Sequence, residues 1–225
     1  MKIVVLPGLD GTGRLVQSFA DYLRADHAVE IFSYPVDLAS YAEIDEWLAP
    51  RLPEGPYLIV AESFSGPLAI KIAARRPAGL RAVAFVATFA RAPVRFPPRL
   101  IRTLNLIPGS LRVLSKVGQT FTFGLKRSCD DVASYQAALR QVPPGTLVER
   151  LCATASVDVR RELSRIAAPC AYLRAAQDRL VHRSVSEDFL PYCERVIAVD
   201  APHFLLLTRP KEAAGHVSDF LNAVA

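Results

Sequence analysis

Short, almost continuous apolar runs alternate with amphipathic runs over most of the chain. The first kind is typical of strands buried on both faces of a parallel sheet, and the second of helices that cover such a sheet. We therefore predict six strands, over residues 2–6, 28–34, 57–61, 82–87, 170–174 and 195–199. Helices are predicted between them, over residues 12–24, 41–49, 67–74, 184–190 and 209–224. The predicted fold class is α/β, a mainly parallel sheet flanked by helices.

The alternation stops between residues 91 and 156. Prolines there separate short helical stretches such as 111–117 and 131–140, and the sequence has no strand pattern. Because this segment follows the fourth predicted strand, we interpret it as a small helical cap inserted into the α/β core. The predicted division is a core of residues 1–90 and 157–225 and a cap of residues 91–156.

The segment that joins the third predicted strand to the next helix reads Ala-Glu-Ser-Phe-Ser-Gly, residues 61–66. A serine at such a junction, with small residues two positions away on each side, is the pattern of a nucleophile elbow. Ala61 and Ser65 stand at the small positions, where glycine is usual. The turn would present the Ser63 hydroxyl at a helix N-terminus, where backbone N–H groups stabilise an oxyanion. Ser65 is the alternative nucleophile, but Pro67 would then occupy its small position, so we favour Ser63.

A glycine-rich loop, residues 7–13, follows the first predicted strand. It lacks the Lys-Ser/Thr end of a phosphate-binding P-loop, and its glycine order is not the dinucleotide fingerprint. Ligands of such sheets bind outside the carboxyl ends of the strands, so we expect the loop to supply an oxyanion donor, the N–H of Leu9. The N–H of Phe64, directly after the nucleophile, is the expected second donor. The residues beside these groups are predicted to contact the substrate: Gly8, Asp10 and Glu62.

A serine nucleophile needs a base. Four histidines are available. His27 precedes a strand at the wrong end of the sheet, and His216 lies inside the last predicted helix. His203 follows the sixth predicted strand and is favoured, while His182, in a loop, is the weaker candidate.

The base in turn needs a carboxylate that fixes its tautomer. Asp178 follows the fifth predicted strand and is favoured for this role. Its rival, Asp200, is only three residues from His203 and would have to fold back on its own loop. The resulting chain order, Ser63, Asp178 and His203, is the order expected of α/β-hydrolases.

Four segments, residues 6–11, 61–66, 176–181 and 202–207, together resemble the α/β-hydrolases. The resemblance covers nearly the whole chain and implies serine hydrolase chemistry at the residues above. The family implies a sheet whose first strands are antiparallel, but this chain begins with the strand that feeds residues 7–13 and so resembles a trimmed version. Relatives often have His at the position of Glu62, which bears on substrate preference. A serine nucleophile also argues against dehalogenase and epoxide hydrolase chemistry, which uses a carboxylate.

The spacing of cysteines and the length of apolar runs indicate which compartment and which cofactors to expect. The four cysteines are far apart and form no Cys-x-x-Cys pair, which is typical of reduced thiols rather than of a disulfide framework or a zinc site. The apolar run at residues 3–6 is too short for a signal peptide, and no run approaches the length of a membrane span. We expect a cytoplasmic protein with neither metal nor cofactor.

The net charge of +5 is uneven, because residues 91–150 carry ten Arg and Lys against three Asp and Glu. Such a basic cap is either a solvated face or a surface for an acidic partner. Nucleic acid is excluded as a partner, since no reader motif or aromatic platform accompanies the charge. The basic residues concerned are Arg95, Arg99, Arg102, Arg112, Lys116, Lys126 and Arg127.

These patterns predict a serine esterase or thioesterase that acts on a small-molecule ester or acyl thioester. The plan also resembles the carboxylesterases that cleave pimeloyl-acyl-carrier-protein methyl ester, which implies an acidic acyl carrier protein as a partner of the basic cap. An acyltransferase with the same three residues, or a non-catalytic ligand receptor, is the alternative. Apolar cap residues either line a medium acyl or aromatic pocket or form the cap's own core: Phe96, Leu100, Leu104, Leu106, Ile107, Leu111, Leu114, Phe121 and Phe123.

Overall fold

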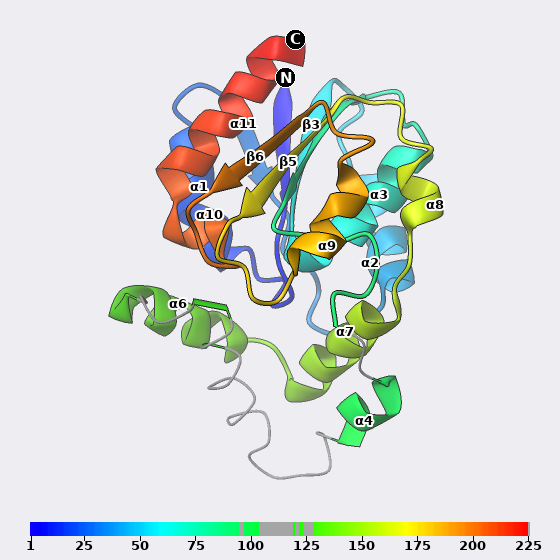
Figure 1. Ribbon diagram of the computed structural model, residues 1–225, viewed down its shortest axis with the longest axis vertical. Coiled ribbons are helices and arrows are strands. Elements are labelled where there is room, and N and C mark those ends of the chain that lie inside the picture. The colour runs from blue at the N-terminus through cyan, green and yellow to red at the C-terminus, as the bar shows by residue number, and fades with distance from the viewer. Residues whose placement is uncertain (95–96, 104–118, 120–121, 124–127, 225) are drawn as a thin grey trace.

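The structure is a computed structural model of the 225-residue chain. It describes all residues except 95–96, 104–118, 120–121, 124–127 and 225. A six-stranded sheet in the order β2-β1-β3-β4-β5-β6 forms the centre of the molecule (Figure 1). Every neighbouring pair is parallel, which confirms the predicted sheet. The strands are β1 (Lys2–Leu6), β2 (Ala28–Ile31), β3 (Tyr57–Glu62), β4 (Leu80–Val86), β5 (Cys170–Ala175) and β6 (Arg195–Val199).

The sheet buries apolar side chains on both faces. In β1, Ile3 and Val5 pack on one face while Val4 and Leu6 pack on the other, because successive side chains of a strand point to opposite sides. This two-sided burial explains why the strand sequences are almost continuously apolar.

Helices cover the two faces in separate layers (Figure 1). One layer consists of α1 (Gln17–Leu23) and α11 (Pro210–Val224), which share a buried cluster with Ile3 and Val5. The other layer packs on Val4 and Leu6 and consists of α2 (Tyr41–Leu48), α3 (Gly66–Ala74) and α8 (Arg160–Leu163). Short helices α9 (Arg183–Ser186) and α10 (Leu205–Thr208) follow β5 and β6.

The segment between β4 and β5 contains three further described helices, which lie beyond the carboxyl ends of the strands (Figure 1). They are α4 (Pro98–Arg102), α6 (Cys129–Leu139) and α7 (Pro144–Ser156). α6 confirms the helix predicted over 131–140, whereas the helix predicted over 111–117 lies outside the described residues. An antiparallel bridge between Arg91 and Asp158 joins the two ends of this segment. The division into a core and a cap at residues 91 and 156 stays a prediction.

Candidate active site

Ser63 lies where β3 passes into the 3-10 helix η3 (Ser63–Ser65), which continues into α3. Its backbone φ is +49°, a left-handed value that a residue with a side chain adopts only at a cost in free energy. The strain arises because the chain must reverse from strand to helix within one residue. This is the backbone geometry that the sequence pattern predicts for a nucleophile elbow.

The position in the turn that admits no side chain is Gly66. A Cβ there would overlap the side chain of Thr88, which is itself fully buried after β4. The Thr88 hydroxyl donates a hydrogen bond to the carbonyl of Ser63 and so holds the turn from its other side. Ala61, at a predicted small position, is also fully buried.

The hydroxyl of Ser65, the alternative nucleophile, has two partners. It donates to the carbonyl of Pro7, and its oxygen lies 2.6 Å from the hydroxyl of Tyr34. Because the single Ser65 proton goes to Pro7, Tyr34 is the donor in the second bond. Ser65 therefore joins the elbow to the neighbouring loops, which leaves Ser63 as the serine with a histidine beside it.

The structure brings Ser63, His203 and Asp178 together, although they are far apart in the sequence. Ser63 Oγ lies 2.7 Å from His203 Nε2, and His203 Nδ1 lies 2.8 Å from Asp178 Oδ2. The second carboxylate oxygen, Oδ1, accepts the N–H groups of Leu180 and Val181 at 2.8 and 2.9 Å. Since Asp178 accepts the proton of Nδ1, Nε2 is left to accept the proton of the Ser63 hydroxyl.

The alternative base, His182, and the alternative carboxylate, Asp200, lie elsewhere. His182 is exposed and caps α9, where its ring accepts the N–H of Ser184. Asp200 is exposed and accepts a 2.6 Å hydrogen bond from the side chain of Gln177. In the part of the chain that the structure describes, neither residue forms a hydrogen bond or ion pair with Ser63 or His203.

Two buried groups beside Ser63 have shifted pKa values. Burial lowers the pKa of His203, but the charge and the hydrogen bond of Asp178, with a smaller effect of Glu62, outweigh it and raise the pKa above its ordinary value. Burial raises the pKa of Glu62 to about 7; His203 opposes this shift and Asp10 adds to it. The site thus contains an imidazole with a raised pKa and, beside it, a second carboxyl group whose pKa is raised to about 7.

The predicted oxyanion donors belong to two segments, the turn after Ser63 and the loop that follows β1. Phe64 occupies the first turn of η3, where N–H groups have no partner within the helix. Among the described residues, the N–H of Leu9 donates no hydrogen bond. The loop that carries Leu9 is close to the elbow, since a Cβ on Gly8 would lie 4.0 Å from Ser63 Cβ.

The three residues predicted to contact substrate all lie at this junction. Gly8 is buried, and a Cβ on it would lie 3.7 Å from Glu62 Oε2 and 3.9 Å from Asp10 Oδ1. Asp10 accepts hydrogen bonds from the N–H and the hydroxyl of Thr12. Glu62 is 1% exposed, and within the described chain its Oε1 has no hydrogen-bond partner.

Sequence reasoning missed Arg150. It projects from α7 and is fully buried, and its guanidinium donates hydrogen bonds to backbone carbonyls of the loop that carries Leu9. Burial lowers the pKa of Arg150, against the influence of Asp10 and Tyr34. The sequence could have revealed the helix, since Pro144 precedes a run with apolar residues at helical spacing, but not that Arg150 is buried.

An aromatic cluster stands next to His203. Phe204 packs against Phe123 and Tyr135, with ring centroids 5.0 and 5.2 Å away, and Phe123 and Tyr135 meet edge to face. Two of these rings come from the segment predicted as the cap. Burial raises the pKa of Tyr135 to about 12, so its hydroxyl is neutral near pH 7.

Several residues predicted from the cap sequence lie outside the described residues: Phe96, Leu104, Leu106, Ile107, Leu111, Leu114 and Phe121 of the apolar set, and Arg95, Arg112, Lys116, Lys126 and Arg127 of the basic set. Of the remainder, Phe123 is buried in the aromatic cluster, Leu100 is 58% exposed, and Arg102 pairs with Glu149. The acyl carrier protein partner stays a prediction.

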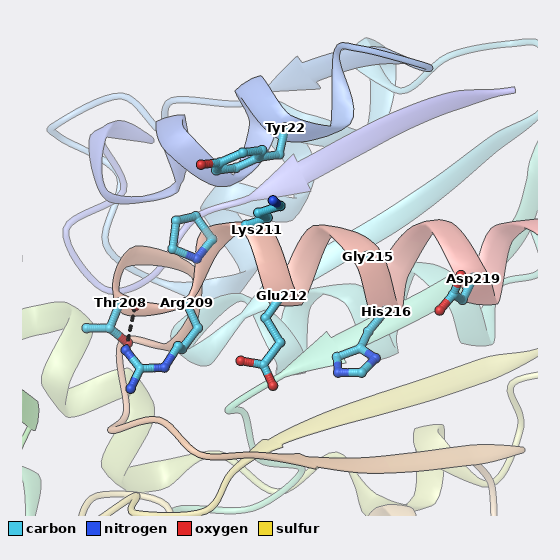
Figure 2. A pocket seen from close by; sticks show the side chains of 9 residues that line it. Tyr22, Thr208, Arg209, Lys211, Glu212, Gly215, His216 and Asp219 are labelled. Carbon is cyan, nitrogen blue, oxygen red and sulfur yellow. Dashed lines mark hydrogen bonds between the residues drawn. The ribbon is translucent and has the colours of Figure 1, made fainter.

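An open groove of about 600 Å³ lies away from Ser63, between α1 and α11 (Figure 2). Its lining includes Tyr22, Lys211, Glu212 and His216, and none of the residues that contact Ser63. In the described ranges no three His, Cys, Asp or Glu side chains are grouped as metal ligands. None of the described helices is both long and apolar enough to cross a membrane.

Solved structures with the same fold are numerous, and three illustrate the likeness. The enol-lactonase from Burkholderia xenovorans LB400 has a TM-score of 0.85 at 16% identity, over 98% of this chain and 91% of that one. A hydrolase from Pseudomonas aeruginosa PA01 has a TM-score of 0.83 at 18% identity, over 98% and 89% of the two chains. A bromoperoxidase from Bacillus anthracis has a TM-score of 0.81 at 17% identity, over 98% and 91%.

At these identities the likeness establishes the fold, which is that of the α/β-hydrolases. No curated protein matches the sequence. The family model described as serine aminopeptidase, S33, matches residues 25–196, a span that includes Ser63 and Asp178 and ends before His203. Because this match covers well over half of the chain, the protein belongs to that family of α/β-hydrolases.

Proposed function

We propose that the protein is a serine hydrolase that cleaves carboxylic esters or thioesters through an acyl-enzyme on Ser63. One observation carries the proposal, the pair of short hydrogen bonds that join Ser63 to His203 and His203 to Asp178. A hydroxyl whose proton faces a neutral, carboxylate-oriented imidazole is the arrangement that activates serine as a nucleophile.

In the proposed reaction, Ser63 Oγ attacks the acyl carbon while His203 Nε2 takes the hydroxyl proton. The same nitrogen then gives this proton to the departing alcohol or thiol. Asp178 holds the ring by its Nδ1 proton and stabilises the imidazolium that forms. A water molecule, deprotonated by His203 in its turn, releases the acid and restores the Ser63 hydroxyl.

The negative oxygen of the tetrahedral intermediate would be held by the N–H groups of Leu9 and Phe64. The N–H of Leu9 has no partner among the described residues, which supports this assignment, since such a donor is available to a ligand. Each such donor typically contributes about 3 kcal/mol to stabilising the transition state. Gly8, Asp10 and Glu62 are the proposed substrate contacts at the same junction.

The similarity to an enol-lactonase favours an ester as the scissile group, because a lactone is a cyclic ester. The family description, serine aminopeptidase, makes an aminoacyl amide the main competing substrate. Both bonds are cleaved by the same acyl transfer, so a direct comparison of an ester with an amide separates them.

The test is to assay p-nitrophenyl esters of increasing acyl length and an aminoacyl arylamide with wild-type protein and Ser63→Ala. We expect ester turnover in the wild type and a kcat lower by about 10⁶-fold in Ser63→Ala. Ser65→Ala is the matched control and should remain active. Ester turnover that survives in Ser63→Ala contradicts the proposal.

The same assay separates the alternatives. Ester formation from added alcohols, in preference to hydrolysis, would indicate an acyltransferase. Stoichiometric labelling of Ser63 by a fluorophosphonate without turnover of any ester would indicate a receptor.

A further inference from the structure

The guanidinium of Arg150 is bound to backbone carbonyls on two segments. Nη1 donates to the carbonyls of Leu9 and Asp10 at 3.1 and 2.7 Å. Nε and Nη2 donate to the carbonyl of Leu38 at 3.1 and 2.9 Å, and Nη2 also donates to that of Pro35 at 3.2 Å. All three guanidinium nitrogens are therefore engaged, and each acceptor is a peptide oxygen.

Arg150 has no carboxylate within ion-pair distance among the described residues. Asp10 lies near enough for its charge to oppose the lowering of the pKa of Arg150, but not near enough to pair with it. Burying a charge without a directly paired counter-ion is costly, and an apolar side chain of similar size often serves packing equally well. The property that only arginine supplies here is a rigid planar fork of donors, which fixes the directions of several carbonyls at once. The interaction is therefore suited to setting backbone geometry.

The carbonyls of Leu9 and Asp10 that Arg150 holds directly follow the peptide unit that bears the proposed oxyanion donor. The N–H of Leu9 belongs to the Gly8–Leu9 unit, whose carbonyl accepts the N–H of Gly11 at 3.0 Å. The next two carbonyls, of Leu9 and Asp10, both accept from Arg150. Because a trans peptide unit is planar, the N–H of Leu9 points away from the Gly8 carbonyl, and among the described residues it has no partner. Arg150 fixes the two units that follow and so limits how far this unit can rotate.

The same guanidinium packs closely on the rest of the site. A Cβ on Gly11, whose φ is +69°, would lie 2.5 Å from Arg150 Nη1, so the loop and the fork are in direct contact. The guanidinium also lies 5.9 Å from the ring centroid of Tyr34, whose hydroxyl binds Ser65, two residues after Ser63. Both segments that carry a proposed oxyanion donor are thus linked to Arg150.

We infer that Arg150 is a positioning residue that holds the N–H of Leu9 toward the oxyanion and so couples helix α7 to the chemistry at Ser63. The inference rests on the proposed function, because the direction of this N–H matters only if an oxyanion forms there. A displacement of about 1 Å in a positioning element is enough to lower a rate about 100-fold.

The experiment compares Arg150→Met, Arg150→Lys and the control Arg102→Met for hydrolysis of one p-nitrophenyl ester. Arg102 comes from α4 and pairs with Glu149 at the surface. We expect Arg150→Met to lower kcat by about 100-fold with KM changed by less than about threefold, and Arg150→Lys to fall between it and the wild type. Arg102→Met should stay within about twofold.

Two readouts separate positioning from mere stability. Affinity for a trifluoromethyl ketone, which forms a tetrahedral adduct on Ser63, should fall by the same factor as kcat. The acid limb of the pH profile should stay in place, because His203 and Asp178 are untouched. All rates are measured below the unfolding temperature of each variant.

A kcat for Arg150→Met within twofold of the wild type, or a loss of kcat without any loss of adduct affinity, overturns the inference. If Arg150→Met does not fold, Arg150→Lys decides the question by the same two readouts. Failure of the proposed function is distinguishable, since Ser63→Ala would then remain active.

Discussion

The proposed site joins two regions that contribute in different ways. The carboxyl edge of the sheet, defined as residues 7–11, 61–66, 176–181 and 200–204, carries Ser63, His203 and Asp178, each within four residues of a strand end. Helices α6 and α7, called the cap helices because they lie in the segment predicted as the cap, contribute Tyr135 and Arg150. Arg150 bonds to Asp10, 140 residues away in the sequence, and Tyr135 packs on Phe204.

The difference between these regions is one of chemical role. At the carboxyl edge, side chains bond to one another and can exchange protons. From the cap helices, a guanidinium bonds to backbone and an aromatic ring packs on Phe204. Changes at the edge should therefore alter the reaction itself or its pH dependence, whereas changes in the cap should alter positioning or stability.

The largest effect on the reaction is expected for Asp178→Asn, which tests the role of the carboxylate at the carboxyl edge. The Asn oxygen can still accept the N–H groups of Leu180 and Val181, which turns its NH₂ group toward His203 Nδ1 and forces the wrong tautomer. We expect kcat to fall about 10⁴-fold with the fold retained, as measured by ester hydrolysis and circular dichroism. Asp200→Asn is the control and should match the wild type. A loss of less than tenfold in Asp178→Asn contradicts the assignment of the carboxylate.

Glu62→Gln tests the raised pKa of Glu62 through the pH dependence of the free energy of unfolding. The pKa of Glu62 is raised to about 7 by burial, so the folded state holds this proton more tightly than the unfolded state. The associated stability is complete below the unfolded pKa and is lost as the pH rises through about 7. Relative to the wild type, Glu62→Gln should therefore gain up to about 3 kcal/mol in unfolding free energy between pH 5 and pH 8.5. A pH-independent difference in urea denaturation would refute this.

The same substitution should also move the activity profile. The negative charge of Glu62 helps to raise the pKa of His203, and the base works only when neutral. Removing that charge lowers the pKa of His203, so the acid limb of kcat/KM should shift to lower pH. An acid limb that moves to higher pH would show that another group controls the base.

The sequence predicted the carboxyl edge far better than the contacts of the cap, and the cause is physical. Ser63, Asp178 and His203 each follow a strand whose apolar run is readable locally, and parallel strands bring their carboxyl ends to one edge. Arg150 has no such local marker. Its role depends on where α7 packs, and the burial of an arginine by tertiary packing leaves no pattern in the neighbouring sequence.

Tyr34 lies between the two regions, because it bonds to Ser65 and its ring faces the guanidinium of Arg150. Tyr34→Phe tests how much this connection stabilises the fold. The substitution removes the 2.6 Å hydrogen bond to Ser65 but leaves the bond from Ser65 to Pro7 in place. We expect a loss of about 1 kcal/mol in unfolding free energy and a kcat within about threefold of the wild type. Tyr22→Phe is the control, because Tyr22 is 49% exposed on α1. A loss of stability as small as that of the control would mean that the bond contributes nothing.

The smallest expected effect concerns the other arginine of the cap. Arg102 forms an ion pair with Glu149 at 2.9 Å, but the two side chains are 58% and 40% exposed, so water and salt screen their attraction. A double-mutant cycle of Arg102→Met and Glu149→Gln should give a coupling of less than about 1 kcal/mol that decreases as salt is added. Arg150, which has no carboxylate partner among the described residues, should matter far more to the reaction. A coupling above about 2 kcal/mol for the surface pair would show that this exposed ion pair stabilises the fold, against the expected screening.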